Sequence, residues 1–281
     1  MPIKNGMVMK MSSEFLFSSR EVMKTTAQML KKDPQDLILD KIAFLVFPRA
    51  TLERLLQLTN ASKAEWILKG YHPYSSPEKV YRGSYEGIGI TIIQPQMSSS
   101  PFAVQIEDLI TCGVEVIFLL CGAWALGPTQ LGDIVIPEVC VGPDGTSPYY
   151  FPKYTHTPEF HQDPKVVKAL VEGLEKIGFK NFSIGKNASC EAFYRITKLL
   201  KTDFERQGCT IMENGEANTL LAIAKEKEII AGILFYAYLN LNEPLGLPEE
   251  TIREKMRIAG RAEADAALFA VKRLMDAGKI K

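Results

Sequence analysis

The sequence predicts an α/β protein, a single domain with a central mixed β-sheet flanked by helices. Three apolar runs have the length and composition of strands buried on both faces, namely residues 41–47, 116–120 and 229–238. Segments with helical spacing separate these runs, and strands that alternate with helices are typical of this class. No Pro/Gly/Ser-rich linker and no shift in composition divides the 281 residues. We therefore expect one domain at residues 41–281, with residues 1–40 as a helical extension packed on it.

Composition and charge describe an ordinary soluble protein. Hydrophobic residues make up 46% and charged residues 23%, with 33 basic and 33 acidic side chains. A net charge of zero gives no sign of a nucleic-acid or membrane partner. Five cysteines without CxxC spacing argue for reduced thiols rather than for disulfides or a zinc site. With no signal-peptide pattern and no run near the ~18 apolar residues of a membrane span, we expect a cytoplasmic protein without a metal.

The first third of the chain predicts a helix, a strand, a second helix and a hairpin. The hydroxyl of Ser18 or Ser19 can cap a helix at residues 20–32. Pro48 closes the strand at 41–47, and a helix begins near Thr51. Aromatic and β-branched residues on both sides of Gly87 predict the hairpin, with arms at 81–86 and 88–93. A loop at 96–101 then leads into a helix at 102–111.

The stretch at residues 116–137 is the centre of the predicted fold. Its first five residues form a buried strand, and the small residues Cys121, Gly122 and Ala123 then break it. A second break at 131–133 returns the chain through a short strand at 134–136. An uncharged loop at the carboxyl end of a strand is a common ligand-binding position in α/β sheets, although two core strands joined by a turn explain the pattern too.

The remainder of the chain continues the alternation of helices and strands. Helical spacing predicts helices at 164–177, 217–227 and 248–277, the last of them one long helix or a helix pair. A short strand is expected at 181–184, and the apolar strand at 229–238 is expected to be central in the sheet.

Three segments together resemble the family of purine nucleoside phosphorylases and uridine phosphorylases, which also includes nucleosidases. The first is residues 118–137, which end in the unaltered family segment LGDIVIP at 131–137. The second, ASCEAFY at 188–194, is similar to the base-binding segment of the family. The third, ENGEANTLL at 213–221, resembles the stretch that opens a helix and binds the ribose. The resemblance spans residues 41–233.

The resemblance implies a chemistry. Cleavage of an N-glycosidic bond develops positive charge on the ribose and negative charge on the base, so the site needs a carboxylate, an anion cradle and donors to the base. Glu216 matches the ribose-binding carboxylate, with Gly215 beside it, and the alternative is a first-turn glutamate at a helix amino end. Phe193 would stack on the substrate, and Gly122 and Ala123 would line the pocket. Inorganic phosphate is the co-substrate, and no other cofactor is implied.

The phosphate-binding positions depart from the family pattern. Arg54 aligns with a family arginine and is expected to be catalytic, and Arg49 lies beside the position of a lost glycine. Leu120 and Ala123 replace a second arginine and a hydroxyl. Ser98, Ser99 and Ser100 can bind the anion through hydroxyls and helix amides, or form only a solvated capping turn.

The base end carries neither of the family markers. The residues that recognise uracil align near Thr197 and Leu199, which leaves Arg195 as the nearest cation, and Tyr236-Ala237-Tyr238 stands where purine enzymes have an aspartate. His156 and His161 lie in a segment that often folds over the site in relatives.

Three functions remain open at the level of sequence. We expect phosphorolysis of a nucleoside first, hydrolysis by the same fold second, and non-catalytic nucleoside binding third. The partners are then a nucleoside and phosphate, without nucleic acid or membrane. The resemblance implies a homo-oligomer, a dimer or a trimer of dimers, and aromatic residues from Tyr71 to Tyr85 are of the kind common at interfaces.

Overall fold

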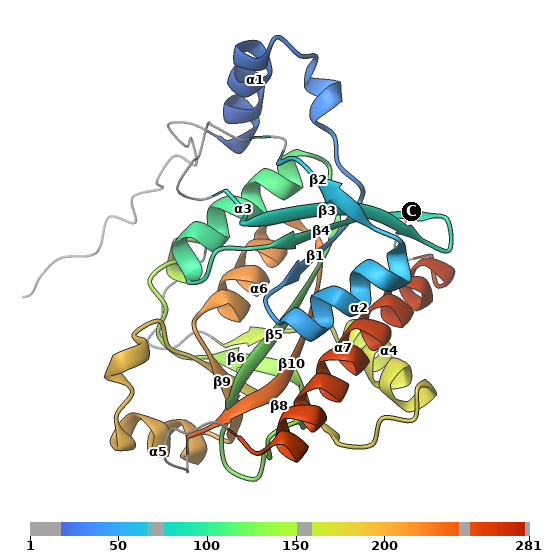
Figure 1. Ribbon diagram of the computed structural model, residues 1–281. Helices are drawn as coiled ribbons and strands as arrows, with labels where there is room; N and C mark the ends of the chain where they lie inside the picture. Colours follow the sequence, from blue (N-terminus) through green and yellow to red (C-terminus); the bar gives the residue numbers. More distant parts are fainter. Residues whose placement is uncertain (1–17, 67, 69–75, 151–158, 242–247, 279–281) are drawn as a thin grey trace, which may run out of the picture.

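The computed structural model of the protein describes residues 18–66, 68, 76–150, 159–241 and 248–278 (Figure 1). Its strands belong to one sheet. They are β1 Ile42–Val46, β2 Ser62–Ala64, β3 Lys79–Tyr85, β4 Ile88–Gln94, β5 Val116–Ala125, β6 Ile134–Val141, β7 Phe160–His161, β8 Phe182–Ser189, β9 Cys209–Glu213 and β10 Ile230–Asn240.

The sheet is mixed, and part of it closes on itself. Its order is β10-β6-β8-β9-β5-β1-β4-β3-β2, with β7 on β6, and β10 returns to pair with β5. Strand β5 is central because it pairs in parallel with both β1 and β10, and antiparallel with β9 at Trp124 and Ala125. The strands β10, β6, β8, β9 and β5 thus form a closed ring, from which β1 to β4 extend as an open arm.

Helices cover both faces of the sheet. They are α1 Ser19–Leu30, α2 Arg49–Thr59, α3 Ser99–Thr111, α4 Pro164–Lys176, α5 Lys198–Arg206, α6 Glu216–Lys227 and α7 Glu250–Asp276, with short 3-10 turns η1 Pro34–Leu37, η2 Ser147–Tyr150 and η3 Phe193–Arg195. Helices α2, α4 and α7 lie together on one face, and α3 and α6 lie on the other (Figure 1). Each face has its own apolar core, so the predicted class and architecture are confirmed.

The expected first helix is present and packs on α3. Ser18 and Glu21 form a capping box at its amino end. The hydroxyl of Ser19 accepts a hydrogen bond from Thr111 Oγ1 at 2.6 Å and donates one to Glu107 at 3.3 Å. Ser19 therefore joins the extension to α3, while residues 1–17 lie outside the described residues.

Three predicted strand ends are wrong. The strand expected at 181–184 is β8, which does not end at Ile184 but runs to Ser189. Strand β5 does not break at residues 121–123, because Gly122 pairs with Tyr236 and Ala123 with Ala237 on β10, and ladder pairing carries the strand to Ala125. Strand β6 does not end before Pro137, since a register shift after Pro137 lets pairing with β8 continue to Val141. The uncharged segment that follows β5 therefore begins later than expected, and the small residues lie within the strand.

The described helices include none that is long and apolar enough to cross a bilayer. Nor do the described residues contain a group of three or more His, Cys, Asp or Glu side chains that could hold a metal ion. All five cysteines are free thiols.

Candidate functional site

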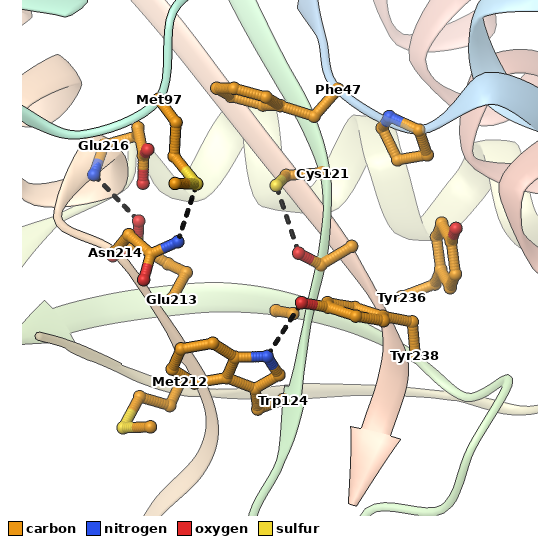
Figure 2. Close-up of a pocket in the computed structure, with 13 residues that line it drawn as sticks. Phe47, Met97, Cys121, Trp124, Met212, Glu213, Asn214, Glu216, Tyr236 and Tyr238 are labelled. Atoms are coloured by element: carbon orange, nitrogen blue, oxygen red, sulfur yellow. Dashed lines mark hydrogen bonds between the residues drawn. The ribbon is translucent and has the colours of Figure 1, made fainter. Parts of the chain in front are cut away.

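A cavity of about 270 Å³ lies at the carboxyl ends of β1 and β9, over the carboxyl-terminal halves of β5 and β10. Figure 2 shows Glu213 and Glu216 on one side of it and Tyr236 and Tyr238 on the other, with Trp124 between the two sides. The lining residues are Phe47, Pro48, Met97, Cys121, Gly122, Ala123, Trp124, Met212, Glu213, Asn214, Glu216, Tyr236 and Tyr238. We call the side with Glu213 and Glu216 the acidic wall. The aromatic wall consists of Tyr236, Tyr238 and the adjoining Trp124.

The acidic wall is built by the turn from β9 into α6. Glu213 ends β9 with 3% of its surface exposed, and its Oε2 accepts hydrogen bonds from the backbone amides of Gly215 and Glu216, both at 2.8 Å. Gly215 has φ 104°, a conformation that glycine adopts without strain. The other oxygen of Glu213 accepts hydrogen bonds from Asn187 Nδ2 at 3.1 Å and from Ser189 Oγ. Glu213 therefore holds the helix start in place.

Burial raises the pKa of Glu213 well above its ordinary value, and the carboxyl of Glu216 raises it further. Hydrogen bonds from Ser189 and Asn187 lower this pKa only in part. The raised pKa favours the protonated form of the Glu213 carboxyl.

Glu216 is the first residue of α6 and is 3% exposed. One oxygen accepts a hydrogen bond from the backbone amide of Ser98 at 2.6 Å. Ser98 has φ 82° and ψ 150°, a backbone region that is almost restricted to glycine, and such strain persists only where the surroundings enforce it. The loop before α3 is therefore shaped around the Glu216 carboxyl.

Glu191 occupies the amino end of α3. Its carboxyl accepts hydrogen bonds from Ser99 N at 3.0 Å, from Ser98 Oγ at 3.1 Å and from Gly145 N at 2.6 Å. Burial by itself raises the pKa of Glu191, but the donors of Ser99, Gly145 and Ser98 outweigh it and hold the pKa below its ordinary value. The amides of Ser98 and Ser99, which the sequence offers to a bound anion, thus already donate to carboxylates of the protein.

The two arginines of α2 do not line the cavity. Arg54 forms a bidentate pair with Asp265 of α7, at 2.9 and 2.8 Å, and this hydrogen bonding raises the pKa of the guanidinium. It borders a separate hollow between α2 and α7, together with Arg257 and Arg261. Arg49 is exposed and pairs with Glu53 at 2.7 Å. The roles expected of Arg54 and Arg49 toward phosphate therefore stay predictions.

The segment at residues 188–194 reaches the edge of the cavity through Phe193. Phe193 lies in η3, is 40% exposed and meets the Trp124 ring edge-on, with ring centroids 4.9 Å apart. Arg195 follows on the same turn, is exposed and does not line the cavity. Phe193 thus extends the aromatic wall outward, and a role of Arg195 toward the base stays a prediction.

The cavity has no basic side chain among its lining residues in the described part of the chain. Cys121 lines it, but burial, followed by Glu216 and Glu263, raises the pKa of this thiol well above its ordinary value, so it is not a ready nucleophile. His161 lies on β7 and does not line the cavity, and His156 falls outside the described residues.

A buried carboxyl lies behind the cavity. Glu263 of α7 is fully buried and accepts hydrogen bonds from Thr51 Oγ1 at 2.7 Å and from the amide of Cys121 at 3.1 Å. Burial raises its pKa well above the ordinary value, and both hydrogen bonds oppose this rise. Glu263 therefore ties α2, α7 and the middle of β5 together under the site.

Comparison with known proteins places the chain in a family. The family model described as the phosphorylase superfamily matches residues 45–275. The chain belongs to the phosphorylase superfamily. A curated relative, guanosine phosphorylase of Halorubrum lacusprofundi, is 28% identical over 159 residues, which cover 56% of this chain and 63% of that protein. The match therefore spans less than two thirds of the relative's length.

A solved structure supports the fold of this phosphorylase-superfamily chain. The crystal structure of purine nucleoside phosphorylase from Toxoplasma gondii in complex with immucillin-H aligns with a TM-score of 0.69. The alignment covers 86% of this chain and 94% of that chain at 15% identity, so it shows a shared fold. The resemblance drawn from three sequence segments is confirmed at the level of the family.

Of the expected site residues of this phosphorylase-superfamily chain, the structure brings Gly122, Ala123 and Glu216 into the cavity. Three further expected residues do not line the cavity but donate backbone hydrogen bonds to carboxyls next to it. These bonds run from Gly215 to Glu213, from Ser98 to Glu216 and from Ser99 to Glu191. Sequence reasoning gave no role to Glu213, Glu191, Trp124, Tyr236 or Tyr238. A signal for Trp124 was available, because an aromatic side chain two residues beyond Gly122 on a central strand points to the same face as that glycine.

Proposed function

We propose that this protein cleaves the N-glycosidic bond of a nucleoside with inorganic phosphate as co-substrate, and that a purine nucleoside such as guanosine is the first candidate. Membership of the phosphorylase superfamily and similarity to a guanosine phosphorylase support the reaction class. The observation that carries the proposal is the buried Glu216 carboxyl, which faces an aromatic wall across a cavity of about 270 Å³.

The two walls suit the two ends of a nucleoside. The carboxyl of Glu216 can accept hydrogen bonds from neighbouring ribose hydroxyls and stabilises positive charge that develops on the sugar during cleavage. The ring of Trp124 offers an apolar surface to a planar base, and the Tyr238 side chain lies beside it. A nucleoside bound between the walls therefore has its sugar toward α6 and its base toward β10.

Phosphate would approach from the side of Phe47 and Pro48, which line the cavity where α2 begins. Helix α2 has no side-chain cap on its first amides, and such amides favour an anion. Arg54, on the same helix, can join the anion only if its guanidinium leaves Asp265. Phosphate binding in this proposal thus rests on α2, with Arg54 as its expected cation.

Hydrolysis is the second candidate, and one observation favours it. Burial of a phosphate with close to two negative charges requires paired cations, and no basic side chain lines the cavity within the described residues. Hydrolysis needs no such cation, because the attacking water carries no charge. The products separate the candidates, because phosphorolysis yields ribose 1-phosphate and hydrolysis yields ribose. A protein that binds nucleosides without releasing either product is the third candidate.

The test of the proposed site is Glu216→Gln, with Glu175→Gln on the exposed surface of α4 as the matched control. Loss of the charged hydrogen bond to the sugar should lower kcat/KM for guanosine about 100-fold or more. The control should keep the wild-type rate, and both variants should keep the wild-type circular dichroism spectrum. A folded Glu216→Gln variant with an unchanged rate would remove Glu216 from the site.

A further inference from the structure

Tyr238 lies at an irregularity of β10. Along this strand Ala237 pairs with Ala123 of β5, but Leu239 pairs with Trp124, so the register shifts at Tyr238. An extra residue of this kind is a β-bulge, which re-aims a side chain and occurs often beside active sites. Here the bulge lies where β10 borders the cavity, and the Tyr238 ring lines it.

Gly122 leaves room for this ring. A Cβ atom at Gly122 would lie 2.9 Å from Cδ1 of Tyr238 and 3.4 Å from its Cγ. The ring therefore lies directly over the backbone of β5, and a larger residue at position 122 would displace it.

Trp124 fixes the phenol end of the same side chain. Its Nε1 donates a hydrogen bond to the Tyr238 hydroxyl oxygen at 2.9 Å, as Figure 2 shows. An indole N–H can only donate, so the phenol oxygen is the acceptor of this hydrogen bond. The O–H of Tyr238 can therefore still donate a hydrogen bond to another group. Among the described residues no acceptor for that proton is found, and the hydroxyl borders the cavity.

The hydroxyl stays protonated near neutral pH. Burial raises the pKa of Tyr238 above its ordinary value, and the hydrogen bond from Trp124 opposes this rise only in part. Tyr238 is therefore a neutral hydrogen-bond donor on the aromatic wall, across the cavity from Glu216.

We propose that Tyr238 donates a hydrogen bond to an acceptor atom of the base of a bound purine nucleoside, and that Trp124 is the positioning residue for this donor. The inference rests on the proposed function. The acceptor is a lone pair on the purine edge, either the ring nitrogen N7 or the carbonyl oxygen on C6. As the glycosidic bond breaks, its electron pair moves into the base, and the hydrogen bond strengthens while the proton stays on Tyr238.

The test compares binding of three ligands to the wild type and to Tyr238→Phe. Guanosine has both acceptors, 7-deazaguanosine lacks N7, and 2-aminopurine riboside lacks the oxygen on C6. Tyr238→Phe should bind guanosine about tenfold more weakly, because a buried donor to a ligand is lost. One of the two analogues should bind equally well to the wild type and to Tyr238→Phe, because it lacks the atom that accepts the hydrogen bond from Tyr238. Tyr85→Phe, a half-buried tyrosine of β3 outside the cavity, is the matched control and should change nothing.

Trp124 is tested through coupling. Trp124→Phe keeps an aromatic ring beside the base but removes the indole N–H. Alone it should weaken guanosine binding, but in the Tyr238→Phe background it should add little, because the donor that Trp124 positions is already absent. Calorimetry gives all affinities without requiring turnover. Equal guanosine affinity in wild type and Tyr238→Phe, or the same loss of affinity for all three ligands, would overturn the role of Tyr238 but not the proposed function. A folded wild type that binds none of the three would overturn the inference together with the proposed function.

Discussion

For a single residue, Asp108 shows how a buried carboxyl with no side-chain hydrogen-bond partner among the described residues affects stability. Asp108 lies in α3 and is 3% exposed, and burial, followed by the charge of Glu107, raises its pKa to about 7. Because this pKa lies above that of the unfolded chain, the favourable contribution of Asp108 is complete only below about pH 4 and is lost as pH rises through about 7.

Asp108→Asn should therefore stabilise the protein at pH 8 relative to the wild type and have little effect at pH 4. The gain should be about 1–4 kcal/mol, since one pKa unit corresponds to about 1.4 kcal/mol. Urea unfolding of both proteins at the two pH values measures it, with Asp276→Asn at the exposed end of α7 as the control. A variant that is less stable than the wild type at pH 8 would contradict the assignment.

Of the acidic wall, Glu216 was predictable from sequence and Glu213 was not, and neither were the tyrosines of the aromatic wall. Glu216 belongs to a local segment in which strand, turn and helix start follow one another, so sequence order places it. Tyr238 is placed by a bulge, by the absence of a side chain at Gly122 and by an indole on another strand. These depend on pairing between residues more than 100 positions apart, which no local pattern encodes.

At the level of helices, Arg54 has a structural contact and a proposed ligand. It joins α2 to α7 through Asp265, and it is the proposed cation for phosphate. Its guanidinium and the carboxyl of Asp265 are 30% and 23% exposed, so their pair contributes about 1 kcal/mol or less to stability. A phosphate would compete with Asp265 for the same bidentate fork.

We predict that Arg54→Ala raises the KM for phosphate about tenfold or more, because a hydrogen bond to a charged group contributes about 1.5–3 kcal/mol. Steady-state rates at saturating guanosine measure this, and Arg206→Ala on the exposed surface of α5 serves as the control. A small fall in Tm with an unchanged KM for phosphate would show that Arg54 only joins α2 to α7.

Element positions were predictable where the local pattern is strong. The apolar run of β1, the hairpin around Gly87 and the capped start of α1 all lie where periodicity and turn chemistry put them. Strand β2, with three half-exposed or exposed residues, and the polar helix α5 carry too little apolar pattern to be recognised. Strand β5 continues through the small residues at 121–123 because β10 pairs with them.

At the scale of the whole molecule, the fold class followed from alternating strands and helices, but the ring of strands did not. Its closure depends on β5 pairing with β10 over most of its length and with β9 at its end, contacts between distant parts of the chain. The ring matters for function because it brings Trp124, Glu213 and Tyr238 from three strands to one cavity.

Association of subunits stays a prediction of the family resemblance. Of the aromatic residues expected at an interface, Tyr71 and Tyr74 lie outside the described residues, and Tyr81 and Tyr85 are half-buried on β3. Multi-angle light scattering at micromolar concentration should show a dimer or a hexamer. A stable monomer of 31.4 kDa that still turns over guanosine would contradict this prediction.

In the proposed reaction, this superfamily member uses phosphate to break the glycosidic bond. The most direct measurement is the rate of base release from guanosine against phosphate concentration, with ribose 1-phosphate followed by phosphorus NMR. Phosphorolysis predicts a rate near zero without phosphate, a saturating rise as phosphate is added, and one ribose 1-phosphate for each base released. Base release that is independent of phosphate, with free ribose as the product, would contradict it.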